Sequence, residues 1–188
     1  MNKRFDFIST ALKGLYKVDR KIIQDHRGLL SRLFCVDHFK EIGFNKSIVQ
    51  INHTLTQKKG VIRGMHYQNP PYTETKIVTC IQGEILDVAV DLRQGSSTFL
   101  KWHSEILSSD NQSSLFIPDG FAHGFQTLTE DCHIIYMHSN FFSPDAEEGL
   151  NPVDPKIAIR WPLDVTEVSK KDNNYPMLDD SFKGITIV

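Results

Sequence analysis

An arginine and a histidine lie three residues apart in the densest polar stretch of the chain, Val61-Ile62-Arg63-Gly64-Met65-His66-Tyr67-Gln68. The forked guanidinium of Arg63 suits a phosphate, and His66 titrates near neutral pH, so it can accept and return a proton. In a regular strand this offset would put the two side chains on opposite faces, but Gly64 permits a bulge that re-aims one of them. A strand histidine is more often structural, so this stretch alone leaves both interpretations open.

Four further residues could take part in proton chemistry, and each also has a plainer explanation. Lys76 opens an apolar strand and is either a solvated strand end or a cation that holds a developing enolate oxygen. His123 follows a Pro-Asp-Gly turn and lies between small residues, as a buried structural histidine also would. Tyr136 could be an ordinary core tyrosine, and Asp172 could belong to a solvated charge cluster, Ser169 to Asp172.

The bulk properties indicate one soluble domain. The chain has 188 residues, with 40% hydrophobic and 23% charged residues and a net charge of -2, which gives no reason to expect nucleic acid or an anionic membrane as partner. Three cysteines without CxxC spacing favour a reducing compartment. The N-terminus has no apolar signal region, and no stretch approaches the roughly 20 apolar residues of a membrane span, so we expect a cytoplasmic protein.

Short runs of β-branched and aromatic residues, separated by turn signals, predict an all-β sandwich or barrel. Helical signals are limited to residues 37–42, closed by Gly43. Residues 163–188 form a polar arm that either crosses a barrel mouth or a partner subunit, or is frayed. The predicted strands are 28–34, 47–54, 76–81, 85–92, 114–117, 121–127 and 133–138.

The run from Ile85 to Leu92 alternates, with one apolar face and one face that carries Asp87 and Asp91 beside small residues. This alternation predicts a half-buried strand that lines a polar cavity.

Motifs for other chemistries are missing from the sequence. Metal-binding β-barrels typically supply paired histidines as HxH, but the corresponding stretch here reads Met65-His66-Tyr67-Gln68, and no HxxxH motif occurs. We therefore expect no metal. Glycine-rich phosphate loops and the GxSxG nucleophile motif are absent as well.

Several long motifs in one order resemble the dTDP-4-dehydrorhamnose 3,5-epimerase family from about Lys21 to Asp180. The motifs are Asp25 to Gly28, Gln50 to Asn52, Arg63 to Gln68, Gly83 to Arg93, Pro118 to Phe125, Ser143-Pro144, Asp154-Pro155 and Ile159 to Pro162. The resemblance implies a cupin-type jelly-roll barrel with short helices and a C-terminal arm. We expect one domain over residues 1–188, with a core at about 21–162 and the arm at about 163–188.

The resemblance also implies the chemistry and the partners. It implies a homodimer that acts without metal or cofactor on a 4-keto-6-deoxy sugar carried by a nucleoside diphosphate. The C4 ketone acidifies the hydrogens on C3 and C5, so a base can remove a proton and its return to the other face inverts the carbon.

Site residues follow from the matching motif positions. His66 matches the family's base, Asp172 its carboxylate partner, Lys76 the cation at the C4 oxygen and Tyr136 the acid on the far side of the ring. Positions that bind the substrate or its nucleotide fall on Arg27, Gln50, Asn52, Arg63, His123 and Glu147.

Two departures concern recognition. Arg32 stands where many thymidine-linked members carry Glu, and Phe142 where many carry a Tyr near the nucleotide or sugar. A guanidinium only donates hydrogen bonds where a carboxylate accepts them, so the group recognised at that position could differ. Both residues are predicted to lie in the substrate-binding set. The alternatives are a related 3,4-ketoisomerase, which forms the same enolate, and a non-catalytic barrel that binds a sugar nucleotide.

Overall fold

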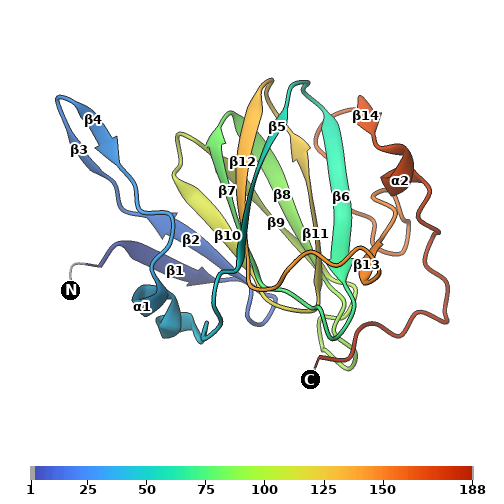
Figure 1. Ribbon diagram of the computed structural model, residues 1–188. Helices are drawn as coiled ribbons and strands as arrows, with labels where there is room; N and C mark the ends of the chain where they lie inside the picture. Colours follow the sequence, from blue (N-terminus) through green and yellow to red (C-terminus); the bar gives the residue numbers. More distant parts are fainter. Residues whose placement is uncertain (1–2, 188) are drawn as a thin grey trace.

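Two antiparallel sheets face each other across the main core of the protein (Figure 1). The structure is a computed structural model that describes residues 3–187. The first sheet has the strand order β1 (Phe5–Ser9), β2 (Tyr16–Arg20), β10 (Ser113–Ile117), β7 (Lys76–Gln82), β12 (Cys132–His138) and β5 (Gln50–Thr56). The second has the order β13 (Glu147–Gly149), β6 (Val61–Gln68), β11 (Phe121–Thr127), β8 (Glu84–Asp91) and β9 (Trp102–Ser108). This arrangement confirms the predicted all-β, cupin-type jelly-roll barrel.

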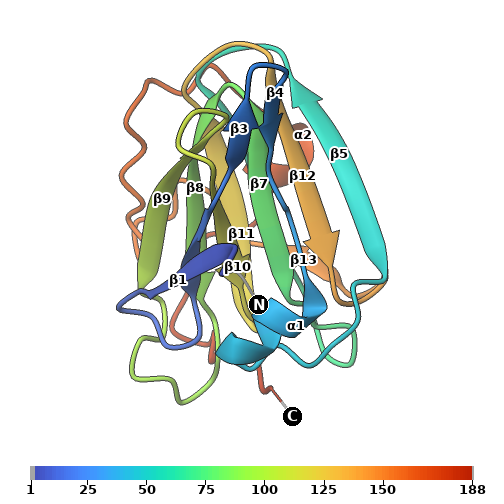
Figure 2. The ribbon, with the colours of Figure 1, turned by 90° about the vertical axis from the view of Figure 1, so that its left-hand side faces the viewer.

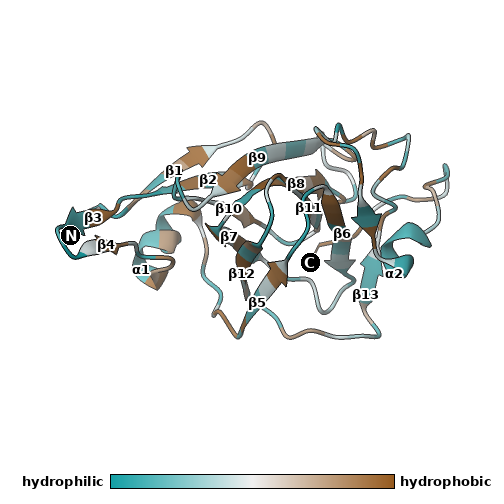
Figure 3. Ribbon diagram, turned by 90° about the horizontal axis from the view of Figure 1, so that it is seen from above, coloured by the Kyte–Doolittle hydropathy of each residue, from teal (hydrophilic) through white to brown (hydrophobic). Residues whose placement is uncertain are grey.

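Apolar side chains from both sheets fill the space between them. Val78 and Ile134 of the first sheet pack in one cluster with Ile85 and Phe125 of the second. Seen from above, apolar stretches of β6, β7, β11 and β12 surround this interior, whereas the outlying helix α2 (Lys170–Asn173) is hydrophilic (Figure 3). Removal of this apolar surface from water is the main force that holds the sheets together.

Smaller elements flank the barrel on opposite sides (Figure 1). A hairpin of β3 (Ile23–Asp25) and β4 (Gly28–Leu30) stands out from the body, in front of the first sheet in Figure 2. Helix α1 (Val36–Phe39) and the 3-10 helix η1 (Lys40–Ile42) follow it and end at Gly43, which confirms the predicted helical segment. At the other side, β14 (Glu167–Val168) pairs with β6 in parallel, and α2 (Lys170–Asn173) comes next.

The arm is anchored, not frayed. Besides the pairing of β14, Ile185 is buried in an apolar cluster with Val88, Val90 and Leu92 on the outer face of β8. Asn151 also donates hydrogen bonds from its amide to the backbone oxygens of Asn173 and Tyr175, both at 3.1 Å. The arm is therefore a mostly polar layer over the second sheet, and its side chains Leu178, Phe182 and Ile185 pack inward.

Some predicted boundaries are wrong. The sheet begins at β1, well before the expected core start near residue 21, because Phe5 and Val18 are buried in an aromatic cluster with α1. The predicted strand 28–34 shrinks to β4, since residues 31–35 leave the hairpin toward α1. The strand predicted at 47–54 is shifted to β5.

The prediction of a half-buried strand at residues 85–92 is also wrong, because β8 is buried on both faces. Leu86, Val88 and Val90 face outward but lie beneath the C-terminal arm and residues 150–161. On the inner face, Asp87 is fully buried beneath the cavity. Asp91 accepts hydrogen bonds within the following turn, from Ser96 and Thr98, both at 2.6 Å.

The predicted bulge at Gly64 is confirmed. His66 lies opposite His123 and Arg63 lies opposite Phe125, so two residues of β6 face the single Gly124 of β11 between these pairs. Gly64 has a φ of +117°, and a Cβ there would lie 2.6 Å from the Cα of Gly124. The extra residue offsets the odd spacing of Arg63 and His66, so both side chains point to the same face of the strand and line the same cavity.

None of the helices among residues 3–187 has both the length and the apolar character required to span a membrane. All three cysteines are free, and Cys80 and Cys132 are buried.

Gly64→Ala is expected to destabilise the fold strongly, because the new Cβ would meet the β11 backbone at a φ unfavourable to L-residues. The matched control is Gly95→Ala, where φ is also positive (+76°) but no atom lies within 4 Å of the new Cβ. The control should lose about 1–2 kcal/mol of unfolding free energy, and Gly64→Ala clearly more, as measured by urea denaturation. Equal losses would show that the close approach to β11 does not constrain the bulge.

Candidate active site

A cavity of about 470 Å³ lies among β5, β7 and β12 of the first sheet and β6 and β11 of the second. Its wall is completed by β13, α2 and the loop that carries Phe142. The cavity brings together most residues of the predicted site: Asn52, Arg63, His66, Lys76, His123, Tyr136, Phe142, Glu147 and Asp172.

The His66 ring is held by Asp172. His66 Nε2 lies 2.7 Å from Asp172 Oδ1, and the backbone N–H of Gly64 donates to Asp172 Oδ2 at 3.2 Å. Asp172 is placed by the start of α2, where Ser169 is the N-cap and accepts a hydrogen bond from the Asp172 N–H. With Nε2–H directed at the carboxylate, the other ring nitrogen, Nδ1, carries the free lone pair.

The Asp172 carboxyl is kept ionised. Burial alone would raise its pKa, but the hydrogen bond from His66 and the N–H of Gly64 outweigh burial and lower the pKa below its ordinary value. A carboxylate in this state fixes the tautomer of His66 and stabilises the imidazolium that forms when the ring accepts a proton.

Lys76 and Tyr136 come from the first sheet, across the cavity from β6. The ammonium of Lys76 is almost fully buried and donates to the backbone oxygen of His66 at 3.3 Å. Burial raises the pKa of Tyr136, although a contact of 3.5 Å from Thr54 Oγ1 opposes the effect slightly. Tyr136 is therefore protonated at neutral pH and can donate its proton.

His123 rests on a second buried carboxylate. Its Nε2 lies 2.7 Å from Asp87 Oδ1, and its ring meets that of Tyr136 edge-on at 5.9 Å between centroids. Burial raises the pKa of Asp87, and the neighbouring His123 opposes the rise. His123 thus braces Tyr136 as well as lining the cavity.

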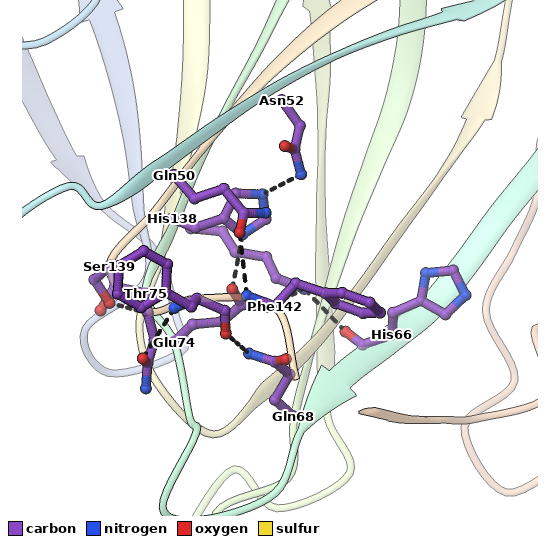
Figure 4. Close-up of polar contacts among 12 residues, drawn as sticks. Gln50, Asn52, His66, Gln68, Glu74, Thr75, His138, Ser139 and Phe142 are labelled. Carbon is purple, nitrogen blue, oxygen red and sulfur yellow. Dashed lines mark hydrogen bonds and ion pairs between the residues drawn. The ribbon is translucent and has the colours of Figure 1, made fainter. Parts of the chain in front are cut away.

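Some of the predicted binding residues line the cavity, and others lie outside it. Arg63 binds Thr56 through Nε at 2.8 Å, and its terminal nitrogens make no hydrogen bond within residues 3–187. Glu147 forms an ion pair with Lys171 of α2. Gln50 does not line the cavity; its side-chain oxygen accepts from the backbone N–H of Phe142 at 3.1 Å and so holds the loop in place (Figure 4).

Arg27 and Arg32 lie outside the cavity of their own chain. Arg27 is at the tip of the β3–β4 hairpin, largely exposed, and pairs with Asp25 at 2.6 Å. Arg32 is exposed in the segment after the hairpin. Neither residue contributes to the site that the single chain forms.

Five charged or titratable cavity residues were not predicted as site residues from the sequence: Glu74, His138, Tyr67, Glu167 and Lys171. The two-residue alternation of strands could have identified the first two. His138 follows Tyr136 by two positions and Glu74 precedes Lys76 by two, so each shares a face with a predicted residue. Lys171 carried no such signal, because its position depends on how α2 docks against β13.

Within residues 3–187, no group of three or more His, Cys, Asp or Glu side chains has an arrangement that could hold a metal ion.

A jelly-roll barrel with a histidine–carboxylate pair on one wall and a protonated tyrosine and a lysine on the other defines an acid–base isomerase. The family profile described as dTDP-4-dehydrorhamnose 3,5-epimerase matches residues 9–180. The chain belongs to this family. It is thus an isomerase of the epimerase type, in preference to a 3,4-ketoisomerase or a non-catalytic barrel.

The sequences of individual relatives are similar to this chain over most of their length. The dTDP-4-dehydrorhamnose 3,5-epimerase of Shigella flexneri is 40% identical over 168 residues, which cover 89% of this chain and 92% of the relative. The dTDP-4-dehydrorhamnose 3-epimerase of Streptomyces niveus is 31% identical over 171 residues, 90% of this chain and 82% of the relative.

A solved structure is similar throughout. The dTDP-6-deoxy-D-glucose-3,5-epimerase of Legionella pneumophila Philadelphia 1, in complex with dTDP-4-keto-L-rhamnose, superposes with a TM-score of 0.91 at 36% identity. The match covers 98% of this chain and 99% of that one.

Asp172→Asn should cost stability in a pH-dependent way. Because the pKa of Asp172 is lowered by folding, its contribution is fully present above the unfolded pKa of about 4 and is lost as the pH falls through the folded value. The difference in unfolding free energy between wild type and Asp172→Asn, from urea titrations, should therefore shrink below about pH 4.

The exposed Asp145→Asn serves as the control for that experiment, and its difference from wild type should stay small throughout. A wild-type advantage over Asp172→Asn that is constant from pH 3 to pH 7 would contradict the ionised pair.

Proposed function

We propose that the protein inverts C3, C5 or both of a 4-keto-6-deoxy sugar linked to thymidine diphosphate, with His66 as base and Tyr136 as acid. The observation that carries this proposal is the placement of the two side chains on facing sheets, β6 and β12, around one cavity. A sugar ring between them would present opposite faces to base and acid, which inversion requires. The ligand of the Legionella pneumophila relative supports the choice of substrate.

In the proposed mechanism His66 removes the proton from a carbon next to the C4 ketone. The free lone pair on Nδ1 accepts it, and Asp172 stabilises the resulting imidazolium. The buried ammonium of Lys76 lies beside the β6 backbone, where it can stabilise the enolate oxygen in a site of low dielectric constant. Tyr136 then protonates the carbon from the far side. The substrate's own ketone supplies the acidity, so the reaction requires no cofactor.

The diphosphate would bind near Arg63. A smaller hollow of about 300 Å³ adjoins the main cavity and shares Arg63 with it, and Lys58 also lines this hollow. Guanidinium groups with free terminal nitrogens suit phosphate oxygens. The sugar would then occupy the main cavity with its C4 oxygen toward Lys76.

Replacement of the base and of the acid should separate the two half-reactions. His66→Ala is expected to lose both C–H exchange and inversion, by about 10²–10⁴-fold, with dTDP affinity within a few-fold of wild type. Tyr136→Phe should keep C–H exchange but slow inversion, because the enolate still forms. Proton NMR of dTDP-4-keto-6-deoxyglucose in deuterated water measures exchange at C3 and C5 and inversion together.

Exchange in His66→Ala at half the wild-type rate or more would rule out this base. Equal loss of exchange and inversion in Tyr136→Phe would mean that Tyr136 is required before the enolate forms. Deuterium at C3 alone would assign the narrower activity that the Streptomyces niveus relative is named for.

The protein is proposed to act as a homodimer in which the β3–β4 hairpin reaches the partner's cavity. Leu29 and Leu30 are 55% and 64% exposed on a hairpin that projects from the barrel of its own chain (Figure 1). An exposed apolar hairpin that carries a predicted binding arginine is explained if a second copy covers it. The three free cysteines support a reducing compartment, and we propose the cytoplasm.

Mixed dimers test this assembly. Arg27→Ala and His66→Ala homodimers should both be weakly active, because every site lacks one group. In a mixed dimer one site would regain both groups, so a refolded equimolar mixture should recover about a quarter of wild-type activity. If the mixture shows only the average of the two parents, Arg27 does not act in the partner's site.

A further inference from the structure

Glu74 is a buried carboxylate that contacts two cavity residues at once. It lies just before β7, and its side chain is 9% exposed. Oε1 lies 3.2 Å from the Lys76 ammonium and Oε2 lies 2.7 Å from Nδ1 of His138. Figure 4 shows Glu74 below His138.

His138 links Glu74 to Asn52. Its Nε2 lies 3.4 Å from the amide nitrogen of Asn52 (Figure 4). A carboxylate accepts hydrogen bonds only, so Nδ1–H of His138 donates to Glu74, and Nε2 accepts from the Asn52 amide. The orientation of the amide is thereby fixed: the N–H is engaged by His138, and the Asn52 oxygen is left for the cavity.

Glu74 also supplies the nearest full negative charge to Lys76. Burial by itself would raise the pKa of Glu74, but His138 and Lys76 more than compensate and lower it, so the carboxyl is ionised. The other groups that face the ammonium are the His66 carbonyl of β6, His138 of β12 and, at longer range, Asp87 of β8 with its partner His123 of β11. Without Glu74, a buried ammonium would have only the shared Asp87–His123 pair as a counter-charge.

We propose that Glu74 is a positioning residue for the epimerisation: it holds the Lys76 cation at the substrate ketone and, through His138, the Asn52 amide that contacts the sugar. This inference rests on the proposed function, because it assigns Glu74 to the residues that would meet the ketone and the sugar.

Two variants separate the contact of Glu74 with Lys76 from its contact, through His138, with Asn52. Glu74→Gln keeps the size of the side chain but removes the charge that holds the Lys76 ammonium in place, so kcat should drop on the order of tenfold. His138→Ala leaves Glu74 beside Lys76 and removes the link to Asn52, so it should raise KM several-fold and keep kcat close to that of the wild type.

The assay is NMR epimerisation of dTDP-4-keto-6-deoxyglucose at several substrate concentrations, with calorimetric binding of dTDP as a check that each variant is folded. A kcat of Glu74→Gln within twofold of wild type overturns the proposal. If Glu74→Gln does not bind dTDP, His138→Ala decides: an unchanged KM overturns the proposal, and a raised KM with a kcat close to wild type supports it. Wild-type protein without any exchange would refute the proposed function itself, which is a different result.

Discussion

The site depends on one carboxylate that holds both the proposed base and the strand that carries it. Asp172 accepts from the ring of His66 with one oxygen and from the backbone N–H of Gly64 with the other. The second contact is made at the bulge of β6, the feature that turns Arg63 and His66 toward the same cavity. A polar arm with few apolar residues therefore becomes part of the cavity wall, since α2 supplies the group that the bulge and the histidine both require.

The two sheets divide the proposed chemistry between them, and a buried carboxylate stands behind each histidine of the cavity. His66 and His123 of the second sheet are held by Asp172 and Asp87, and His138 of the first sheet is held by Glu74. Such pairs keep each ring in a defined tautomer and keep the carboxylates from remaining buried without a partner. The cavity thus combines fixed hydrogen-bond geometry with positive charge at Lys76 and Arg63, as an enolate and a diphosphate would require.

Much of this arrangement could be predicted from the sequence, and the failures share one physical cause. Short β-rich runs with turn signals predicted an all-β sandwich or barrel, and Gly64 indicated where a bulge could form, because both are local properties of the chain. The family resemblance, not these runs, implied the jelly-roll barrel. The exposure of β8 was misjudged because its cover comes from residues 150–161 and from Ile185, which lie far from β8 in the sequence. Strand alternation puts Glu74 and His138 on the same faces as Lys76 and Tyr136, but their pairing with each other depends on strand register across the sheet. Arg27 was placed in the site by its motif, yet the position of a hairpin relative to a cavity is set by packing that no local pattern records.

The most direct test of the account is the protonation state of the two His66 ring nitrogens at neutral pH. Nitrogen-15 NMR of histidine-labelled protein, with His66→Gln to assign the signals, distinguishes Nε2–H from Nδ1–H. We expect Nε2–H in the wild type, with the Nδ1 lone pair free to act as base, and a loss of this preference in Asp172→Asn. A predominant Nδ1–H tautomer in the wild type would contradict it, because Asp172 would then hold the nitrogen that lacks the proton and the base would have no free lone pair.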